Sequence, residues 1–493
     1  METLQRTANR GSVSTGYDID NSIMFSTLGT YADSNSYFYH LMNPGGDDNW
    51  AATSTNGTNA RKVTVSLWFK RTLTTESSHY PRLFDYRAGG VAFSVYINDS
   101  DKLKMYDDNT SMSMESNMVF RDTSAWYHMV VAIDQTQSTA SNRVKVYVNG
   151  EQITSWGTED YGNQNVDLSC FRADSVSFYI GGAANDAGAY FNGYIAEYHF
   201  IDGQQLAQTE FGEFSDDGIW IPKEFTGSYG ILGHYYNFSD SSDMGEDFSG
   251  NNNDANNRGS GITNGSARQS TDTPTNNFCT MNPLWANSYT TYTDGATNVD
   301  TTGSGWMSMA STFAVSKGKW YWEFKRDSGN AFVGIVDTED TYIPISTAGY
   351  FFGYNDNSST NSIGLYSANG QVYNSPGGTP DAAGFTTSNI VGVAVDMDNY
   401  KLYYHIDGTY AGSMDPANGT GGVTIPTTWN SDYIYMGFSG FNGSYVVNFG
   451  GYTTISISSG ASDGNGYGTF EYAPPTNYLS ICSQNLASDG GTA

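Results

Sequence analysis

Acidic side chains are the first residues to examine for chemistry, because a pair of carboxylates could hydrolyse a glycosidic bond. A retaining glycosidase needs its two carboxyl groups about 5 Å apart, which on one strand requires an acidic alternation such as Glu-x-Asp-x-x-Glu. The chain contains no such run, and Glu197 stands in an aromatic stretch without a neighbouring carboxylate. Asp337, Glu339 and Asp340 follow an expected strand and are interpreted as a polar turn. We therefore predict no catalytic residues and no enzymatic activity.

The histidines do not predict a zinc site. They are His40, His79, His128, His199, His234 and His405. None lies near another or in the H-x-x-x-H spacing that zinc sites use. His128, His199 and His405 fall in aromatic strands, and we interpret them as structural. The chain also lacks a G-x-S-x-G elbow, a P-loop and a dinucleotide-binding fingerprint.

Calcium is the one cofactor that the sequence leaves open. Calcium takes six to eight oxygen ligands, and two oxygen-rich turns could supply them. One turn carries Asp99 and Asp101, and the other carries Asp107 and Asp108. Neither turn has EF-hand spacing, so we prefer to interpret both as solvated hairpin turns and assign no metal ligand.

A sugar-binding site needs an aromatic platform beside polar groups, and three aromatic residues of the first half fall in loop-like stretches. They are Tyr86, Trp156 and Tyr161. Aromatic residues also fill sandwich cores and subunit interfaces, so both interpretations stay open for each of the three.

The elements that must position these residues are strands. Aromatic residues make up 15% of the 493 residues, whereas disordered chains have few aromatics. Short stretches such as 63–69, 91–97 and 144–148 alternate with period two and are separated by Gly, Asn and Asp turns. Helical periodicity is nearly absent. The composition predicts an all-β fold of the sandwich or jelly-roll type.

The charge and the cysteines exclude several classes of protein. The net charge is −29, and no cluster of Lys and Arg is present, so nucleic acid and anionic membranes are not expected partners. The acidity is interpreted as a solubility feature, with divalent-cation sites as the alternative. Cys170, Cys279 and Cys482 are far apart and odd in number, which predicts free buried thiols. We expect no signal peptide and no membrane-spanning segment, and hence folding in a reducing cytosol.

The length predicts more than one domain, because single cores stop growing at roughly 250–300 residues. A stretch rich in Gly, Asn and Ser has few large apolar residues and no core of its own. It is predicted to be an irregular linker, or an extended segment that lies along its neighbours. The predicted boundaries are an N-terminal arm at 1–16, a sandwich at 17–238, the linker at 239–277, a second sandwich at 278–452 and a C-terminal arm at 453–493.

The two halves share a pattern that predicts the same fold twice. In each half an apolar strand ends in Asp, at Asp134 and at Asp396. A second, aromatic-rich strand follows and ends in Asn-Gly at 149–150 or Asp-Gly at 407–408. These dipeptides tolerate positive φ and close tight hairpins. Each pair of strands is therefore predicted to be antiparallel and buried.

The first half resembles the laminin-G-like, concanavalin A-like jelly roll, and the second half resembles a SPRY domain. The segments that carry the first resemblance are 63–69, 126–134, 144–150, 178–182 and 193–198. Those that carry the second are 318–324, 333–336, 362–366, 390–396, 402–408 and 446–450, in the order found in SPRY domains. The resemblance implies two concanavalin A-like β-sandwich (jelly-roll) domains joined by the irregular linker, with a short C-terminal arm.

The whole layout resembles structural proteins of marine bacteriophages. The segments that carry this resemblance are 14–22, 193–203 running into 214–224, 272–278 and 473–475. It implies a virion protein made in the host cytoplasm, a tail or capsid fibre or adhesin that contacts other virion proteins and attaches to host-surface glycan. A head-decoration protein without a ligand is the alternative, and a secreted glycan-active enzyme is a second one. Apolar residues at 469–486 outside either sandwich predict a homo-oligomer, and the analogy with fibres favours a trimer. The alternative is that the first domain of the same chain covers them.

Overall fold

The computed structural model divides the chain into two compact units, Ser14–Thr275 and Asn276–Ala493, which are described separately. The residues that it describes are 17–26, 38–42, 57–73, 80–88, 90–171, 176–183, 189–255, 268–285, 289–303, 305–340, 351–353, 361–374, 379–380, 384–429 and 432–488. Among them no helix is both long and apolar enough to cross a membrane.

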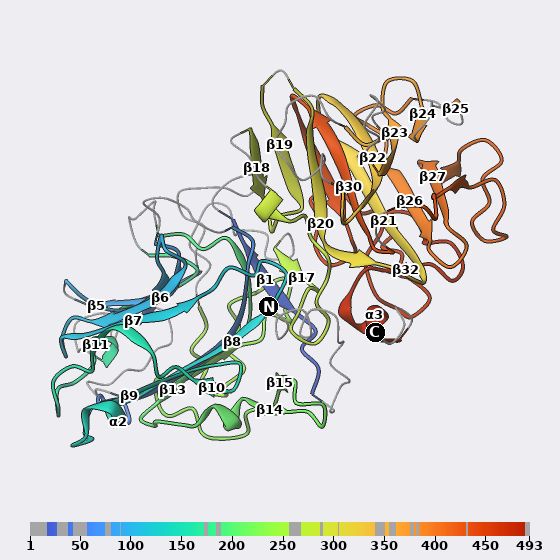
Figure 1. Cartoon of the computed structure of the whole chain (residues 1–493). Coiled ribbons are helices and arrows are strands. Elements are labelled where there is room, and N and C mark those ends of the chain that lie inside the picture. Colours follow the sequence, from blue (N-terminus) through green and yellow to red (C-terminus); the bar gives the residue numbers. More distant parts are fainter. Residues whose placement is uncertain are drawn as a thin grey trace. The chain divides into compact units, whose positions relative to one another are not determined.

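The first unit is built from two antiparallel sheets, shown in blue and green in Figure 1. Within the described residues the first sheet has eight strands, in the order β10 (Glu151–Gln152), β9 (Val144–Val148), β8 (Tyr127–Asp134), β3 (Lys62–Arg71), β13 (Gly193–Asp202), β1 (Ser22–Phe25) and β17 (Gln269–Ser270), with β16 (His234–Tyr236) paired to β13. The second has seven, in the order β11 (Trp156–Asp160), β7 (Met112–Val119), β6 (Lys102–Asp107), β5 (Val91–Ile97), β4 (Arg82–Ala88), β12 (Val176–Ile180) and β2 (Phe38–Met42). Short elements are α2 (Ala140–Arg143), η1 (Ser169–Phe171), η2 (Gln208–Glu210) and the pair β14 (Gly212–Phe214) and β15 (Trp220–Pro222).

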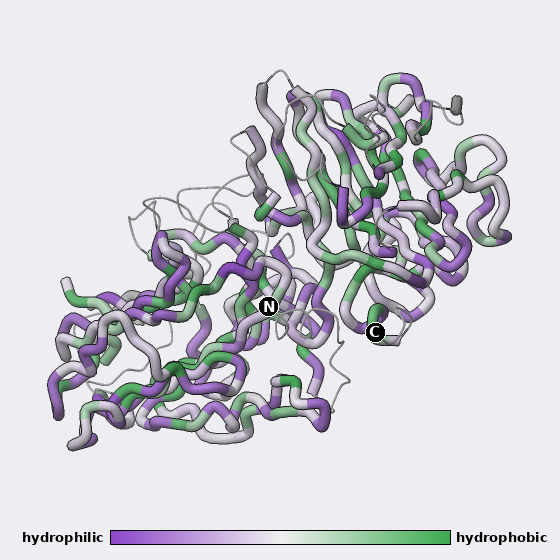
Figure 2. Tube along the Cα trace, viewed as in Figure 1, coloured by the Kyte–Doolittle hydropathy of each residue, from purple (hydrophilic) through white to green (hydrophobic). Residues whose placement is uncertain are grey.

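The core of the first unit lies between the two sheets. Along β9 buried and half-buried residues alternate, as the period-two pattern at 144–148 predicted. Strand β3 is buried on both faces, because the segment that follows β13 covers the outer face of its sheet. In that layer Phe211 packs with Val130 and Ile201. Figure 2 shows the hydrophobic residues concentrated in the strands of each unit.

The stretch 239–277, predicted to be a linker or an extended segment along its neighbours, is part of the first unit as far as Thr275, as the second interpretation predicts. Met244 and Ala255 are buried in the first core. Strand β17 pairs with β1, and Asp272 forms a fully buried ion pair with Lys70 at 2.7 Å. A few anchoring residues thus order a stretch whose average composition is polar. Residues 256–267 lie outside the described ranges.

The second unit is also a pair of sheets, shown in yellow to red in Figure 1. The described part of the first sheet has nine strands, in the order β18 (Thr290–Thr293), β19 (Asn298–Thr301), β31 (Gly443–Asn448), β21 (Lys319–Arg326), β26 (Val391–Asp396), β27 (Lys401–Ile406) and β28 (Thr409–Tyr410), with β29 (Val423–Thr424) on β27 and β32 (Leu479–Ser480) on β21. The second sheet has six described strands, in the order β20 (Met307–Val315), β30 (Ile434–Phe441), β22 (Asn330–Asp337), β23 (Ser362–Tyr366), β24 (Gln371–Asn374) and β25 (Thr379–Pro380). Its short helices are η4 (Pro283–Trp285) and α3 (Ser483–Ser488).

The predicted similarity of the two halves is confirmed in the strand pairing. Strands β3, β8 and β9 lie in the same order in the first unit as β21, β26 and β27 in the second. Asp134 lies opposite Lys62 in the register, and Asp396 lies opposite Lys319. Each pair forms an ion pair at 3.1 Å. The end of the equivalent strand in each unit is therefore stabilised by the same kind of Lys–Asp ion pair.

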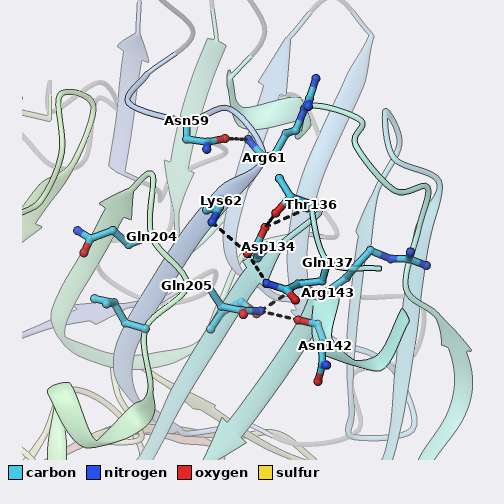
Figure 3. A network of polar contacts seen from close by, with 12 residues as sticks. Asn59, Arg61, Lys62, Asp134, Thr136, Gln137, Asn142, Arg143, Gln204 and Gln205 are labelled. Atoms are coloured by element: carbon cyan, nitrogen blue, oxygen red, sulfur yellow. Dashed lines mark hydrogen bonds and ion pairs between the residues drawn. The ribbon is translucent and has the colours of Figure 1, made fainter. Parts of the chain in front are cut away.

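Figure 3 shows how Asp134 ends its strand in the first unit. Its carboxylate accepts hydrogen bonds from the Thr136 backbone N–H at 2.9 Å and from Gln137 at 2.7 Å, and it pairs with Lys62. Burial alone would raise the pKa of Asp134, but the hydrogen bonds from Thr136 and Gln137 and the contact with Lys62 outweigh burial and lower it. The charged form is therefore favoured in the folded chain.

Substitution of Asp134 by Asn is expected to destabilise the first unit by about 1.5–3 kcal/mol at neutral pH, because hydrogen bonds to a charged group are lost. The folded pKa lies below the usual value of 3.8, so this contribution is complete above that pH and disappears as pH falls through the folded value. Urea unfolding at several pH values checks this. A difference between the two proteins that stayed constant down to pH 2 would contradict it.

The stretch predicted to be a C-terminal arm that docks on another surface, 453–493, packs within the second unit as far as it is described. Phe470, Tyr478 and Ile481 are fully buried. Strand β31 pairs with residues 323–326 of β21, and β32 pairs in parallel with Trp320 and Tyr321 of the same strand. The apolar residues on which the homo-oligomer prediction rested are thus covered by their own unit, and that basis for a homo-oligomer is removed.

The carboxylate of Glu323 fastens this C-terminal stretch to β21. It accepts hydrogen bonds from the backbone N–H groups of Tyr472 at 2.7 Å and Glu471 at 3.0 Å, and from the amide of Asn448 at 3.0 Å. Burial raises the pKa of Glu323, although these hydrogen bonds oppose the rise. A single buried side chain therefore joins the sheet to the main chain of residues 471–472.

Candidate functional site

The outer face of the seven-stranded sheet in the first unit carries a group of polar side chains that could bind a ligand. Side chains alternate along β4, so Tyr86 points into the core while Asp85 and Arg87 point outward. Tyr86 is fully buried and stacks on Phe178 at 4.6 Å between ring centroids. Of the two interpretations left open for Tyr86, the structure therefore supports the one as a core residue, because its ring points away from the outer face.

The register of the strands places these outward residues in two rows across the sheet. In one row Asp85 lies opposite Ser94, and Ser94 lies opposite Tyr106. In the other row Arg82 lies opposite Tyr96, and Tyr96 lies opposite Lys104. Directly opposed side chains contact each other across antiparallel strands. Strands β4, β5 and β6 thereby bring together two basic, one acidic, one hydroxyl and two aromatic side chains.

Arg82 lies at the centre of this arrangement. Its guanidinium is 4.4 Å from the ring centre of Tyr96 and 5.8 Å from that of Tyr106. Such contacts hold the planar cation over the rings. Burial raises the pKa of both tyrosines, and the nearby Arg82 partly opposes the rise. Both hydroxyl groups are therefore neutral at physiological pH and able to donate hydrogen bonds.

Four buried polar atoms of this group lack hydrogen-bond partners. Nε and Nη1 of Arg82, Oδ1 of Asp85 and Oγ of Ser94 have none, although Arg82 is 7% exposed and the other two side chains are fully buried. Oδ2 of Asp85 contacts Nε of Arg87, whereas Oδ1 stays 3.8 Å from Nε of Arg82. Buried polar groups without partners are rare and costly in native proteins. A hydroxyl group between these two atoms would accept from Arg82 and donate to Asp85.

The rim of this surface is also aromatic and charged. Tyr80 is 42% exposed and meets Tyr96 edge to face at 5.7 Å. Lys102 and Lys104 lie 3.9 and 3.7 Å from Glu115 on β7. We call the surface formed by Arg82, Asp85, Arg87, Ser94, Tyr96, Lys102, Lys104 and Tyr106 the polar face.

The other two predicted sugar contacts lie away from the polar face. Trp156 and Tyr161 are half-buried, and both pack against the core of the first unit. Trp156 begins β11, the edge strand on β7. The Tyr161 hydroxyl donates to Glu159 at 2.5 Å, and burial together with this carboxylate raises the pKa of Tyr161 to about 12. The structure does not bring these residues together with Tyr86.

The four residues considered for calcium are mostly committed to donors of the protein itself. Asp101 accepts from Arg71 and Arg121, both at 2.9 Å. Asp107 accepts backbone N–H groups at 2.8 Å, and Asp108 accepts the N–H of Ala92 at 2.9 Å. Burial raises the pKa of Asp107, against the effect of those hydrogen bonds. Asp99 is exposed, and no cluster of three metal-binding side chains is found among the described residues.

Glu197, the carboxylate without an acidic neighbour in sequence, belongs to β13 of the eight-stranded sheet. It sits at a β-bulge with φ of +51°. Its carboxylate accepts from the hydroxyls of Tyr17 at 2.6 Å and Tyr235 at 2.7 Å, and lies 3.4 Å from His199. Burial and this carboxylate raise the pKa of both tyrosines. Both carboxylate oxygens are therefore engaged by groups of the protein.

Ser66 on β3 and His128 on β8 of the same sheet resemble a nucleophile and its base, but the proton is on the wrong nitrogen. Ser66 Oγ lies 2.9 Å from Nε2 of His128. Trp220, which can only donate, gives its indole hydrogen to Nδ1 of His128 at 2.9 Å. Burial lowers the pKa of His128 to about 3, so the neutral ring carries its hydrogen on Nε2. It donates to Ser66 and cannot accept the proton of the hydroxyl.

The second unit carries a different surface, which sequence reasoning missed. On the outer face of its six-stranded sheet Phe332 stacks on Phe351 at 4.2 Å and on Tyr366 at 4.4 Å, and Trp306 lies 4.9 Å from Phe332. Apolar residues at both parities of β22 were the signal for it. This face offers rings but few hydrogen-bonding groups, so the polar face is the better candidate for a specific site.

Comparison with known proteins supports the fold. The family model described as the concanavalin A-like lectin/glucanases superfamily, Laminin_G_3, matches residues 44–210. No curated protein matches the chain in sequence. The chain is an all-β protein with concanavalin A-like sandwich domains.

Several solved structures are similar to parts of the chain. The SPRY domain of human HERC1 is 11% identical with a TM-score of 0.26, over 36% of this chain and 99% of that one. A heptameric SAP-like pentraxin from Limulus polyphemus is 17% identical with a TM-score of 0.27, over 39% of this chain and 80% of that one. The mouse laminin α1 domains LG4-5 are 10% identical with a TM-score of 0.27, over 94% and 97%.

Proposed function

We propose that this chain is a non-enzymatic, carbohydrate-binding protein whose polar face is the glycan site. The observation that carries the proposal is the unpaired set on Arg82, Asp85 and Ser94, flanked by Tyr96 and Tyr106. Sugar hydroxyls both donate and accept, which matches a guanidinium beside a carboxylate. The match of residues 44–210 to a lectin and glucanase superfamily supports the same class of ligand.

The setting proposed for this binding is a virion, where the protein serves as a fibre or adhesin that attaches to host-surface glycan. This part rests on the resemblance to marine bacteriophage proteins stated from the sequence. A decoration protein without a ligand is the competing proposal, and it predicts that no glycan binds. Immunogold labelling of particles, combined with the binding test below, separates the two.

Binding to an array of polysaccharides is expected for the full chain and is expected to fall at least tenfold in Arg82→Gln. The substitution removes the cation that the unpaired set needs while leaving Tyr96 and Tyr106 in place. Arg61→Gln is the matched control, because Arg61 is a half-exposed arginine paired with Asp167 outside the polar face. Equal binding by wild type and Arg82→Gln, with both proteins melting at the same temperature, would refute the assignment of the polar face as the glycan site.

No release of reducing sugar is expected from any polysaccharide that binds. Both oxygens of Glu197 are engaged, and His128 donates to Ser66. The measurement is a reducing-end assay over a day at several pH values, with a commercial glycosidase as the positive control. Release that disappeared on Glu197→Gln would overturn the non-enzymatic proposal.

A further inference from the structure

We infer that the polar face selects acidic glycans, whose sugars bear a carboxylate or a sulfate ester. This inference rests on the proposed function and narrows it to one class of ligand. The described outward-facing charged side chains of β4, β5 and β6 are four cations and one carboxylate. They are Arg82, Arg87, Lys102, Lys104 and Asp85. In a chain with a net charge of −29, this is an unusual concentration of positive charge.

Most of these cations are only loosely paired. Arg82 lies 3.8 Å from Asp85, and Lys102 and Lys104 lie 3.9 and 3.7 Å from Glu115. These distances exceed those of a hydrogen bond between charged groups, which is about 2.7–2.9 Å. Glu115 also serves two lysines at once. An incoming anion can therefore gain short contacts to the cations without first breaking strong ones.

Arg82 gives the surface its selectivity. Two of its nitrogens, Nε and Nη1, have no acceptor, and its guanidinium is held over two tyrosine rings. A planar guanidinium with free donors suits the paired oxygens of a carboxylate or a sulfate. Asp85 Oδ1 and Ser94 Oγ, which are also unpaired, provide places for a neighbouring sugar hydroxyl. An uncharged sugar would provide no negative charge to pair with the cations of the polar face.

The overall charge of the protein makes this selection testable. A chain of net charge −29 repels polyanions in general, so binding to one requires a local site. The probes are polygalacturonate and alginate for carboxylates, dextran sulfate for sulfate esters, and dextran and laminarin as neutral chains. Binding of the full chain is measured in 150 mM salt, for wild type, Arg82→Gln, Arg82→Lys and Arg61→Gln.

We expect binding to at least one class of acidic chain, at least tenfold weaker binding or none to the neutral chains, a loss of at least tenfold in Arg82→Gln and no loss in Arg61→Gln. Arg82→Lys should recover only part of the affinity, because an ammonium cannot hold two oxygens in a plane. Carboxyl reduction of a bound uronate, which keeps its backbone, should abolish binding.

Three results would overturn the inference, and they differ from one another. Binding to neutral chains that depends on Arg82 would leave the proposed function standing and refute selection for acidic sugars. An equal loss in Arg82→Gln and Arg61→Gln would show unspecific attraction of a polyanion. No binding to any polysaccharide would refute the proposed function itself.

Discussion

Truncation after Gly450 is expected to unfold the second unit while leaving the first unit folded. The deletion removes β32 together with Phe470, Tyr478 and Ile481, which are fully buried. Loss of one large core side chain costs about 2–5 kcal/mol, so losing three is comparable to the whole 5–15 kcal/mol that stabilises a typical domain. Calorimetry of the truncated chain should show the melting transition of the first unit alone.

Two further variants make this test specific. Removal of only residues 489–493 should leave both transitions unchanged, because the fastening contacts lie upstream. Glu323→Ala should lower the transition of the second unit alone, since the N–H groups of residues 471 and 472 lose their acceptor. If the truncated chain kept both transitions, the C-terminal stretch would not be part of the fold and an intermolecular role for it would return.

Asp272→Ala is expected to destabilise the first unit by about 3–5 kcal/mol, because it leaves Lys70 charged in a dry interior. The two side chains are 1% and 0% exposed and pair at 2.7 Å. Asp272 also accepts the indole hydrogen of Trp126 at 3.0 Å. Urea unfolding of the purified variant measures the loss.

The double variant Lys70→Met/Asp272→Ala should recover part of that stability, because no lone charge remains buried. Glu246→Ala is the matched control, since Glu246 is an exposed acid in the same polar stretch. An Asp272→Ala protein as stable as Glu246→Ala would mean that residues 268–275 do not anchor the first unit.

The regular part of the fold could be predicted from the sequence because its signals are local. The alternation at 63–69 became β3, and the apolar run ending at Asp134 became β8. Asn149 and Asp407 both adopt φ of +48°, as their Asn-Gly and Asp-Gly dipeptides predicted. These features depend on neighbours in the chain, so a single sequence contains them.

The irregular part could not be predicted, because its anchors act over long distances. Asp272 meets Lys70, which lies 202 residues away, and nothing in a polar stretch marks one aspartate as buried. The polar face was missed for a different reason. Tyr86 was selected for its ring, but alternation along β4 turns it inward and exposes its neighbours Asp85 and Arg87 on the opposite face. The aromatic residue type correctly pointed to β4, but the sequence did not show which face of that strand is turned outward.

The two ends of the second unit lie side by side within it. Phe278 and Cys482 form a β-bridge, the N–H of Cys279 donates to the carbonyl of Ile481 at 2.9 Å, and the N–H of Ser483 donates to the carbonyl of Asn277 at 2.8 Å. A module whose entry and exit coincide can be spliced into a surface loop of a host protein, or re-opened elsewhere as a circular permutant, without stretching either partner. The second unit therefore has the chain geometry of a domain that recombination can insert into another protein as one piece.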